Sequence, residues 1–226
     1  MKSFLYLMQM TDSNLPTGAF SHSFGLETLI HEGKITNSAQ FKPFLINYIS
    51  QLLYTDGLTV RIVYDALEQN DFSPIIEADT RLFCSATAKE TRLGVQRIGQ
   101  QMTKLFCTLY DNENLERYAK LIQQKKCYGH PAICQAIALY DMKLDKKSAI
   151  ETVLYTSVSS LVQNAVRGIP LGQTDGQQMQ LVAIQTCIET AAIGLDLPMA
   201  YFCASSSFLE IQQMKHESIP VRLFMS

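Results

Sequence analysis

Apolar residues recur with the period of an α-helix through most of this 226-residue sequence. Between Ser38 and Tyr54 they follow the spacing i, i+3, i+4, i+7, i+8, i+11 and i+12, which places them on one face of a helix. The segment from Ser148 to Val166 repeats this stripe, and Ser148 and Glu151 have the spacing of a capping box at its start. No segment alternates apolar and polar residues as a half-buried strand does. The pattern predicts an all-α fold.

Further helices are predicted between clusters of turn-forming residues. They run over residues 23–32, 57–70, 75–88, 90–110, 113–125, 131–142, 175–195 and 198–213. The breaks between them are neither long nor polar enough to be linkers between domains. We therefore expect one domain, residues 1–226, built as a bundle of about ten helices.

Charge and hydropathy exclude two classes of partner. The formal net charge is −2, and the sequence lacks the clustered Lys and Arg that phosphate binding needs, so no nucleic acid is expected. The longest uncharged run, Thr152–Val166, is too short and too polar to span a membrane. Met1–Met10 is too short and too weakly charged for a signal peptide. These features predict a cytoplasmic protein.

The cysteines lack the spacing of a metal site. No CxxC pair or Cys/His cluster occurs among the six cysteines, so no structural zinc is expected. Reduced cysteine is a small apolar side chain, and most of the six lie among apolar residues: Cys84, Cys107, Cys134, Cys187 and Cys203. We expect these five to pack in the core, without disulfides.

The segment Asp12–Glu27 places turn formers, hydroxyls and a histidine between two apolar stretches. Ser21 or Ser23 is predicted to cap the following helix, with His22 near its positive end. A catalytic triad of serine, His22 and Asp12 is an alternative, although no G-x-S-x-G elbow is present and adjacent Ser and His do not easily face each other. Capping within a shaped loop is the better physical account.

A second irregular segment runs from Asn164 to Gln178. The apolar helix before it is predicted to end at Gly168 with a left-handed cap, and Thr174 is predicted to cap the next helix. The glycines lack the Gly-Lys-Ser/Thr ending of a nucleotide-binding loop. A tight turn between helices is expected, with Arg167 and Gln173 available for an interaction surface.

The tail, residues 214–226, is unusually apolar for a chain end. It must pack either on its own domain or on a partner that orders it. His216 and Glu217 by themselves are an incomplete metal site.

Taken together, these segments resemble the signature regions of the UreF family of urease accessory proteins. The first matches at Asp12, Ser13, Leu15, Pro16, Gly18, Phe20, Ser21, His22, Ser23, Gly25, Leu26 and Glu27. The second matches at Val166, Arg167 and 169–176, and the third at His216, Glu217, Arg222, Leu223, Phe224 and Ser226. A weaker fourth match is Glu90-Thr-Arg92, while Ala19 and Leu93-Gly94 depart from the family pattern.

The resemblance implies a non-enzymatic, homodimeric assembly factor without a cofactor or bound metal. It would bridge the UreD/UreH accessory protein and the GTPase UreG for nickel insertion into apo-urease. The residues implied in partner binding are Asp12, Pro16, Phe20, Ser21, His22, Ser23, Glu27, Arg167, Gln173, Asp175, His216, Glu217, Arg222, Leu223 and Phe224.

Three other functions remain open on the sequence. The chain could regulate the UreG GTPase through an arginine, for which Arg92, Arg97, Arg167 and Arg222 are available. It could be a serine hydrolase using residues 21–23, or bind nickel directly through His22, His130 or His216.

Overall fold

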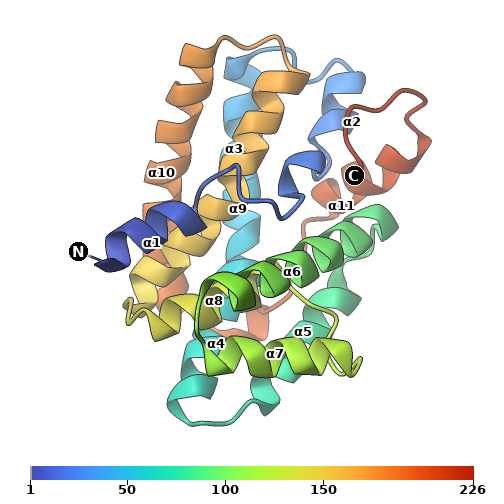
Figure 1. Cartoon of the computed structure of the whole chain (residues 1–226). Coiled ribbons are helices and arrows are strands. Elements are labelled where there is room, and N and C mark those ends of the chain that lie inside the picture. The colour runs from blue at the N-terminus through green and yellow to red at the C-terminus, as the bar shows by residue number, and fades with distance from the viewer. Residues whose placement is uncertain (1) are drawn as a thin grey trace.

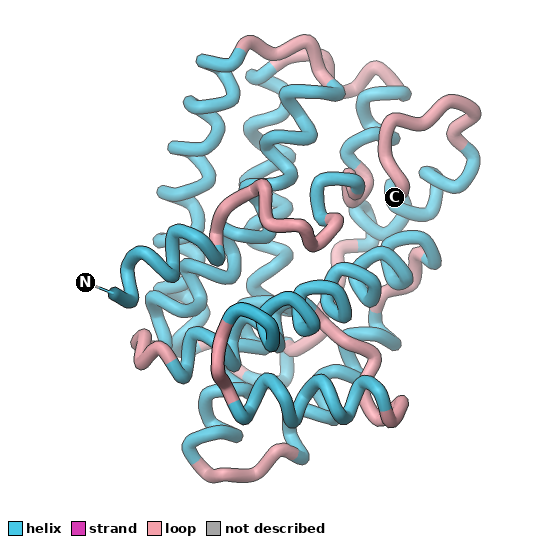
Figure 2. Tube along the Cα trace, viewed as in Figure 1, coloured by secondary structure: helices cyan, strands magenta, loops and turns pink. Residues whose placement is uncertain are grey.

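The computed structural model describes residues 2–226, and within that range it contains helices and no strand (Figures 1 and 2). The α-helices are α1 (Lys2–Met10), α2 (Leu26–His31), α3 (Ser38–Leu52), α4 (Leu58–Glu68), α5 (Ser73–Ser85), α6 (Lys89–Leu109), α7 (Glu113–Gln123), α8 (Pro131–Asp141), α9 (Lys146–Gly168), α10 (Gln173–Asp196) and α11 (Ser207–Lys215). Short 3-10 turns are η1 (Ala19–Ser21), η3 (Met199–Tyr201) and η4 (His216–Ser218), and η2 (Leu53–Gly57) is a π-helical turn. The all-α prediction is confirmed. No helix in residues 2–226 is long and apolar enough to cross a membrane.

Helices α3, α9 and α10 stand side by side and pack closely (Figure 1). Small residues allow this approach: Ala183, Cys187 and Ala191 of α10 are buried. A Cβ built on Gly194 would lie 2.7 Å from Leu53 Cδ1, so a larger residue would push α10 away from η2. Ala132, Ala136 and Ala138 of α8 are buried as well, so the small side chains of both helices pack inside the core.

The second group of helices, α4 to α8, crosses the lower end of this layer (Figure 1). Its organising residue is Asp79, which is 1 % exposed. The Asp79 carboxylate accepts hydrogen bonds from Tyr118 Oη at 2.5 Å, Tyr128 N at 2.5 Å and Gly129 N at 3.0 Å. It therefore fixes the loop that leads from α7 into α8.

The ends of α9 and α10 differ from the predictions. Asp145, rather than Ser148, caps α9, and its Oδ1 accepts from Ser148 N at 3.0 Å. Gly168 stays helical, because its lack of a side chain serves packing: a Cβ there would lie 3.1 Å from Ile30 Cδ1. Helix α10 begins one residue before Thr174, with Gly172 at its N-cap.

Other differences lie at the chain ends and in the cysteines. Helix α1 was not predicted, and Met1 lies outside the described residues. The helix predicted over 198–213 is divided into η3 and α11, because the chain turns at Cys203, whose φ is +68°. Cys84 is exposed, and Cys107 and Cys203 are half-buried, so the prediction that they are core residues was wrong.

Candidate partner-binding site

The tail (residues 214–226) folds back onto the N-terminal segment (residues 12–27), beside α2, α11 and α6 (Figure 1). The Ser226 carbonyl oxygen accepts hydrogen bonds from Ser23 N at 2.5 Å, Phe24 N at 3.2 Å and Ser23 Oγ at 2.7 Å. Met225 N donates to the Ser21 carbonyl at 2.7 Å. Two of the three irregular segments of the sequence are therefore in direct contact.

Glu27 anchors the tail from the first turn of α2. Its side chain accepts backbone hydrogen bonds from Leu223 N at 2.5 Å and Phe224 N at 3.2 Å. It also receives His216 Nε2 at 2.7 Å. Glu27 is only 6 % exposed, so these bonds take the place of the hydrogen bonds to water that its carboxylate loses on burial.

His216 continues this network to α6. The ring is fully buried, and its Nδ1 lies 2.7 Å from Glu90 Oε2. Arg222 Nη1 donates to the other oxygen of Glu90 at 2.6 Å. Burial raises the pKa of Glu90, but hydrogen bonds from His216 and Arg222 outweigh it and hold the pKa below its ordinary value. Glu90 is therefore an ionised partner of the tail.

His22 is buried between the tail and α6. Its Nδ1 lies 2.7 Å from Ser226 Oγ, and its carbonyl accepts from Asn164 Nδ2 at 2.6 Å. Burial, reinforced by the positive charge of Arg97, lowers the pKa of His22 to about 4, so the ring is neutral at neutral pH. The ring has room only because residue 94 is glycine: a Cβ there would lie 2.6 Å from His22 Cε1.

Arg167 joins the Asn164–Gln178 segment to the N-terminal segment and the tail. Its guanidinium donates to the Phe20 carbonyl and to Asn164 Oδ1. It also lies 5.9 Å from the centre of the Phe20 ring and 5.4 Å from that of Phe224, within the range of cation–π contact. The end of α9, the N-terminal segment and the tail thus meet around one side chain.

Comparison with known proteins identifies the family of this chain. The UreF family model matches residues 35–183. The chain is 48 % identical over 228 residues to a protein of Bacillus sp. (strain TB-90) named urease accessory protein UreF, and covers all of both chains. The chain belongs to the UreF family. Proteins of the same name from Geobacillus kaustophilus (strain HTA426) and Lachnoclostridium phytofermentans (strain ATCC 700394 / DSM 18823 / ISDg) are 43 % and 42 % identical over 223 residues, which is 98 % of this chain and 97 % and 98 % of theirs.

Not all the residues implied by the UreF resemblance meet. Asp12 and Pro16 are exposed at the start of the N-terminal segment, where Asp12 Oδ1 accepts from Asn14 N at 2.8 Å. Gln173 is exposed and Asp175 half-buried in the first turn of α10, and Glu217 points to solvent from η4. The cluster around the tail contains the others: Phe20, Ser21, His22, Ser23, Glu27, Arg167, His216, Arg222, Leu223 and Phe224.

Three members of the cluster were not predicted from the sequence as functional: Asn164, Glu90 and Gly94. Asn164 is fully buried in an apolar helix, and a polar residue in such a stripe is itself a signal. Glu90 belongs to the weak fourth match of the UreF pattern, whereas Gly94 departs from that pattern. Ser23 was predicted as a helix cap; Gly25 takes the N-cap position of α2, and Ser23 Oγ makes only a long 3.4 Å contact with Glu27 N.

The contacts do not assemble the alternative hydrolase or nickel sites. His22 faces Ser226 rather than Ser21, Ser23 or Asp12. His130 Nδ1 accepts from Ala132 N at 3.3 Å as the N-cap of α8, and both nitrogens of His216 face glutamates. Within residues 2–226, no three His, Cys, Asp or Glu side chains are arranged to hold a metal ion.

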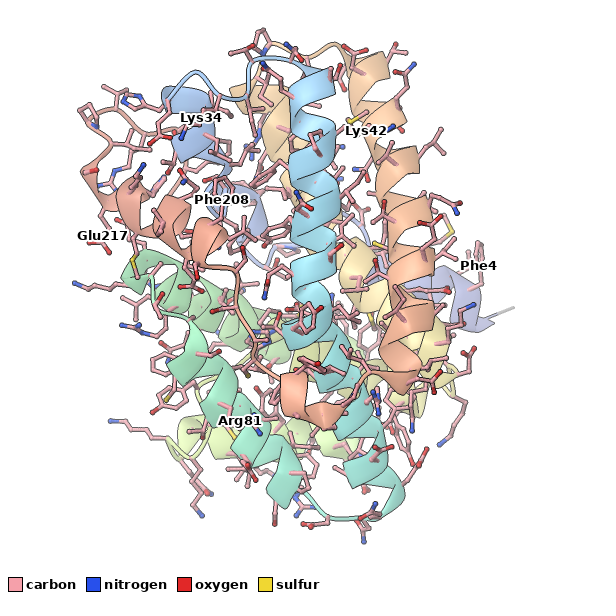
Figure 3. The ribbon with its side chains drawn as sticks, turned by 180° about the vertical axis from the view of Figure 1, so that it is seen from behind. Phe4, Lys34, Lys42, Arg81, Phe208 and Glu217 are labelled. Carbon is pink, nitrogen blue, oxygen red and sulfur yellow. The ribbon has the colours of Figure 1, made fainter. Side chains whose placement is uncertain are left out.

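An apolar surface lies outside the polar cluster. The tail exposes Val221 (81 %), Leu223 (71 %) and Met225 (55 %), while their neighbours Ile219 and Phe224 are buried. Helix α11 adds exposed apolar side chains at helical spacing: Phe208, Ile211 and Met214. We call these six residues the tail face; Phe208 lies on the same side of the molecule as Glu217 in Figure 3.

Proposed function

We propose that this UreF-family chain is a non-enzymatic assembly factor that bridges the UreD/UreH accessory protein and the GTPase UreG. In this role it serves nickel insertion into apo-urease, in the cytoplasm. The proposal rests on the family, whose relatives are named urease accessory proteins. It is supported by a site made of structural hydrogen bonds and exposed side chains.

One observation carries the proposal: residues 223–226 of the tail are held by backbone hydrogen bonds, while Val221, Leu223 and Met225 point their side chains outward. A chain end that served only its own fold would bury Val221, Leu223 and Met225. Clustered exposed apolar side chains on an ordered backbone are typical of protein-binding surfaces. We assign the tail face to UreD/UreH, and the exposed residues Arg167 and Gln173, at the turn between α9 and α10, to UreG.

The assignment is tested by pull-down from cells that co-express this chain with UreD/UreH and UreG. Leu223→Asp leaves the backbone bonds of the tail intact but puts a charge on the tail face. We expect this variant to lose most UreD/UreH capture, because a buried unpaired charge at an interface costs several kcal/mol.

Leu109→Asp is the matched control, because Leu109 is an exposed leucine at the end of α6. It should retain UreD/UreH and UreG. Equal capture by both variants would refute the assignment of the tail face, and capture of neither protein by the wild type would refute the bridging function.

We further propose that the homodimer forms through α1 and α10. Exposed apolar residues lie on both helices: Phe4, Leu5, Tyr6, Met8, Leu181, Ile184 and Ile188. A groove lined by Thr11, Tyr155, Leu181 and Ile184 separates the end of α1 from α9 and α10. Phe4 lies at the opposite edge of the molecule from Glu217 (Figure 3), so a dimer formed here leaves the tail face open.

Regulation of the UreG GTPase is the second candidate function, and the contacts of the four candidate arginines reduce the number that are available for it. Arg92 and Arg222 are engaged within this chain, by the Ala86 carbonyl and by Glu90. Arg167 holds the Phe20 carbonyl, whereas Arg97 is exposed on α6. If this chain supplies an arginine to the GTPase, Arg97→Ala should lower GTP hydrolysis in the assembled complex without reducing assembly; an unchanged rate would remove Arg97 from this role.

A further inference from the structure

The most unusual polar group outside any partner-facing surface is His216. Its ring is fully buried, and each of its nitrogens lies 2.7 Å from a different carboxylate, Glu27 from α2 and Glu90 from α6. Both carboxylates also hold other parts of the tail, since Glu27 accepts from Leu223 N and Phe224 N and Glu90 accepts from Arg222. The attachment of the tail is therefore centred on one imidazole.

Counting protons fixes the charge of that imidazole. A neutral ring carries one N–H, so it can donate to only one of the two carboxylates. Its other nitrogen would then place a lone pair 2.7 Å from a carboxylate oxygen. A proton on Glu90 would relieve this contact, but the bonds from His216 and Arg222 hold the pKa of Glu90 below its ordinary value. The imidazolium form satisfies both bonds while both glutamates stay ionised.

The charges that face His216 balance only in this form. Glu27 on α2 and Glu90 on α6 are negative, and Arg222 from the tail is positive. The imidazolium supplies the second positive charge, whereas a neutral ring leaves a buried excess of one negative charge. Farther away, His22 is neutral, and Arg97 is exposed on α6, where solvent screens its positive charge. The remaining pair of this region, Lys215 with Glu32, is exposed.

We propose that His216, protonated on both ring nitrogens, is a latch that holds the tail against the N-terminal segment, and that loss of one of these protons releases the tail. Without the proton one charge-assisted bond is lost and a buried carboxylate faces a lone pair. The backbone bonds from Leu223 and Phe224 to Glu27 then weaken, because the charged ring no longer holds the Glu27 carboxylate in place. The inference concerns the free chain and needs no partner, so its failure would leave the proposed function intact.

Two measurements on the free chain test the latch. First, long-range proton–nitrogen NMR at pH 6.5 should find protons on both ring nitrogens of His216. Second, hydrogen exchange between pH 6.5 and 9, corrected for intrinsic rates, should reveal about a tenfold loss of protection at the Leu223 and Phe224 amides. The control amide is Leu115, which is also held by a side chain, that of the non-titrating Asn112. A neutral ring at pH 6.5, or unchanged protection of the tail amides, would overturn the proposal.

Glu90→Gln distinguishes release of the tail by His216 from a general loss of stability at alkaline pH. The amide nitrogen of the introduced glutamine can donate to a neutral His216 ring, and its carbonyl oxygen can still accept from Arg222. This variant should therefore keep the tail attached and lose the dependence on pH. If its tail amides lose protection at alkaline pH as in the wild type, a proton on His216 is not what holds the tail.

Discussion

At the scale of single residues, burial of His22 makes the fold sensitive to acid. The ring is 5 % exposed, and its pKa is lowered to about 4. In the unfolded chain a histidine takes up its proton near pH 6.5. Between these values the unfolded state binds more protons, so the free energy of unfolding falls as pH drops from about 6.5 towards 4.

Replacing His22 should remove much of this dependence. We expect His22→Asn to be less stable than the wild type at pH 7, because Asn fills less space, but to lose less stability on acidification, by on the order of 2 kcal/mol. Denaturant unfolding at pH 7 and pH 4.5 measures the difference. His31→Asn, at an exposed histidine, is the control and should follow the wild type.

Gly94 provides a test of packing against the same ring. A methyl group there would lie 2.6 Å from His22 Cε1, and the ring is bonded to Ser226 and cannot easily move. Gly94→Ala should therefore cost about 1–3 kcal/mol and increase exchange of the Ser23 amide. Gly172→Ala adds the same methyl group where nothing lies within 4 Å, so it should cost only the preference for glycine over alanine at an N-cap, about 0.5–1 kcal/mol, and leave exchange of the Ser23 amide unchanged. Equal effects of the two substitutions would contradict the packing of His22 on α6.

At the scale of elements, the loop between α7 and α8 depends on one carboxylate. Asp79 accepts from Tyr118 Oη and from two backbone amides of that loop. Asp79→Ala should lower the free energy of unfolding by about 3 kcal/mol or more, because three buried donors lose their acceptor. Asp71→Ala removes an exposed acceptor from Ser73 N, which water can replace, so it should cost much less. Similar melting temperatures for the two variants would show that Asp79 does not organise the loop.

The elements themselves were predictable because their signals are local. The stripe in α3 appears within fifteen residues and needs no distant partner to be recognised. The errors occurred where packing or an adjacent residue decided the outcome. Gly168 continues α9 because Ile30 and Phe224 lie against it, and Asp145 precedes Ser148 as an equally good cap.

The cluster could be predicted only in part. Most of its residues are among those that the resemblance implies, but their pairing was not predicted, since His216 and Glu27 are separated by 189 positions. No local pattern in one sequence encodes a contact of that separation. The side chains of the tail alternate between buried, as Phe224, and exposed, as Leu223. This alternation likewise depends on backbone bonds to Glu27 and Ser21.

At the scale of the whole molecule, two apolar surfaces lie on opposite edges. If the α1/α10 surface forms the homodimer, Ile184→Asp combined with Ile188→Asp should give a monomer, because two charges would be desolvated at each interface. Analytical ultracentrifugation measures the mass, and Leu109→Asp should remain dimeric. A wild type that sediments as a monomer would contradict this assignment.

The contact between Ser23 and Ser226 closes a loop of 203 positions. During synthesis, the N-terminal segment leaves the ribosome long before the residues that will cover it. Until the tail emerges, Glu27 and His22 lack their partners and the tail face does not exist. A nascent or truncated chain can therefore fold its helices without displaying the surface that we assign to UreD/UreH. Display of this surface therefore depends on attachment of the tail and not only on folding of the helices.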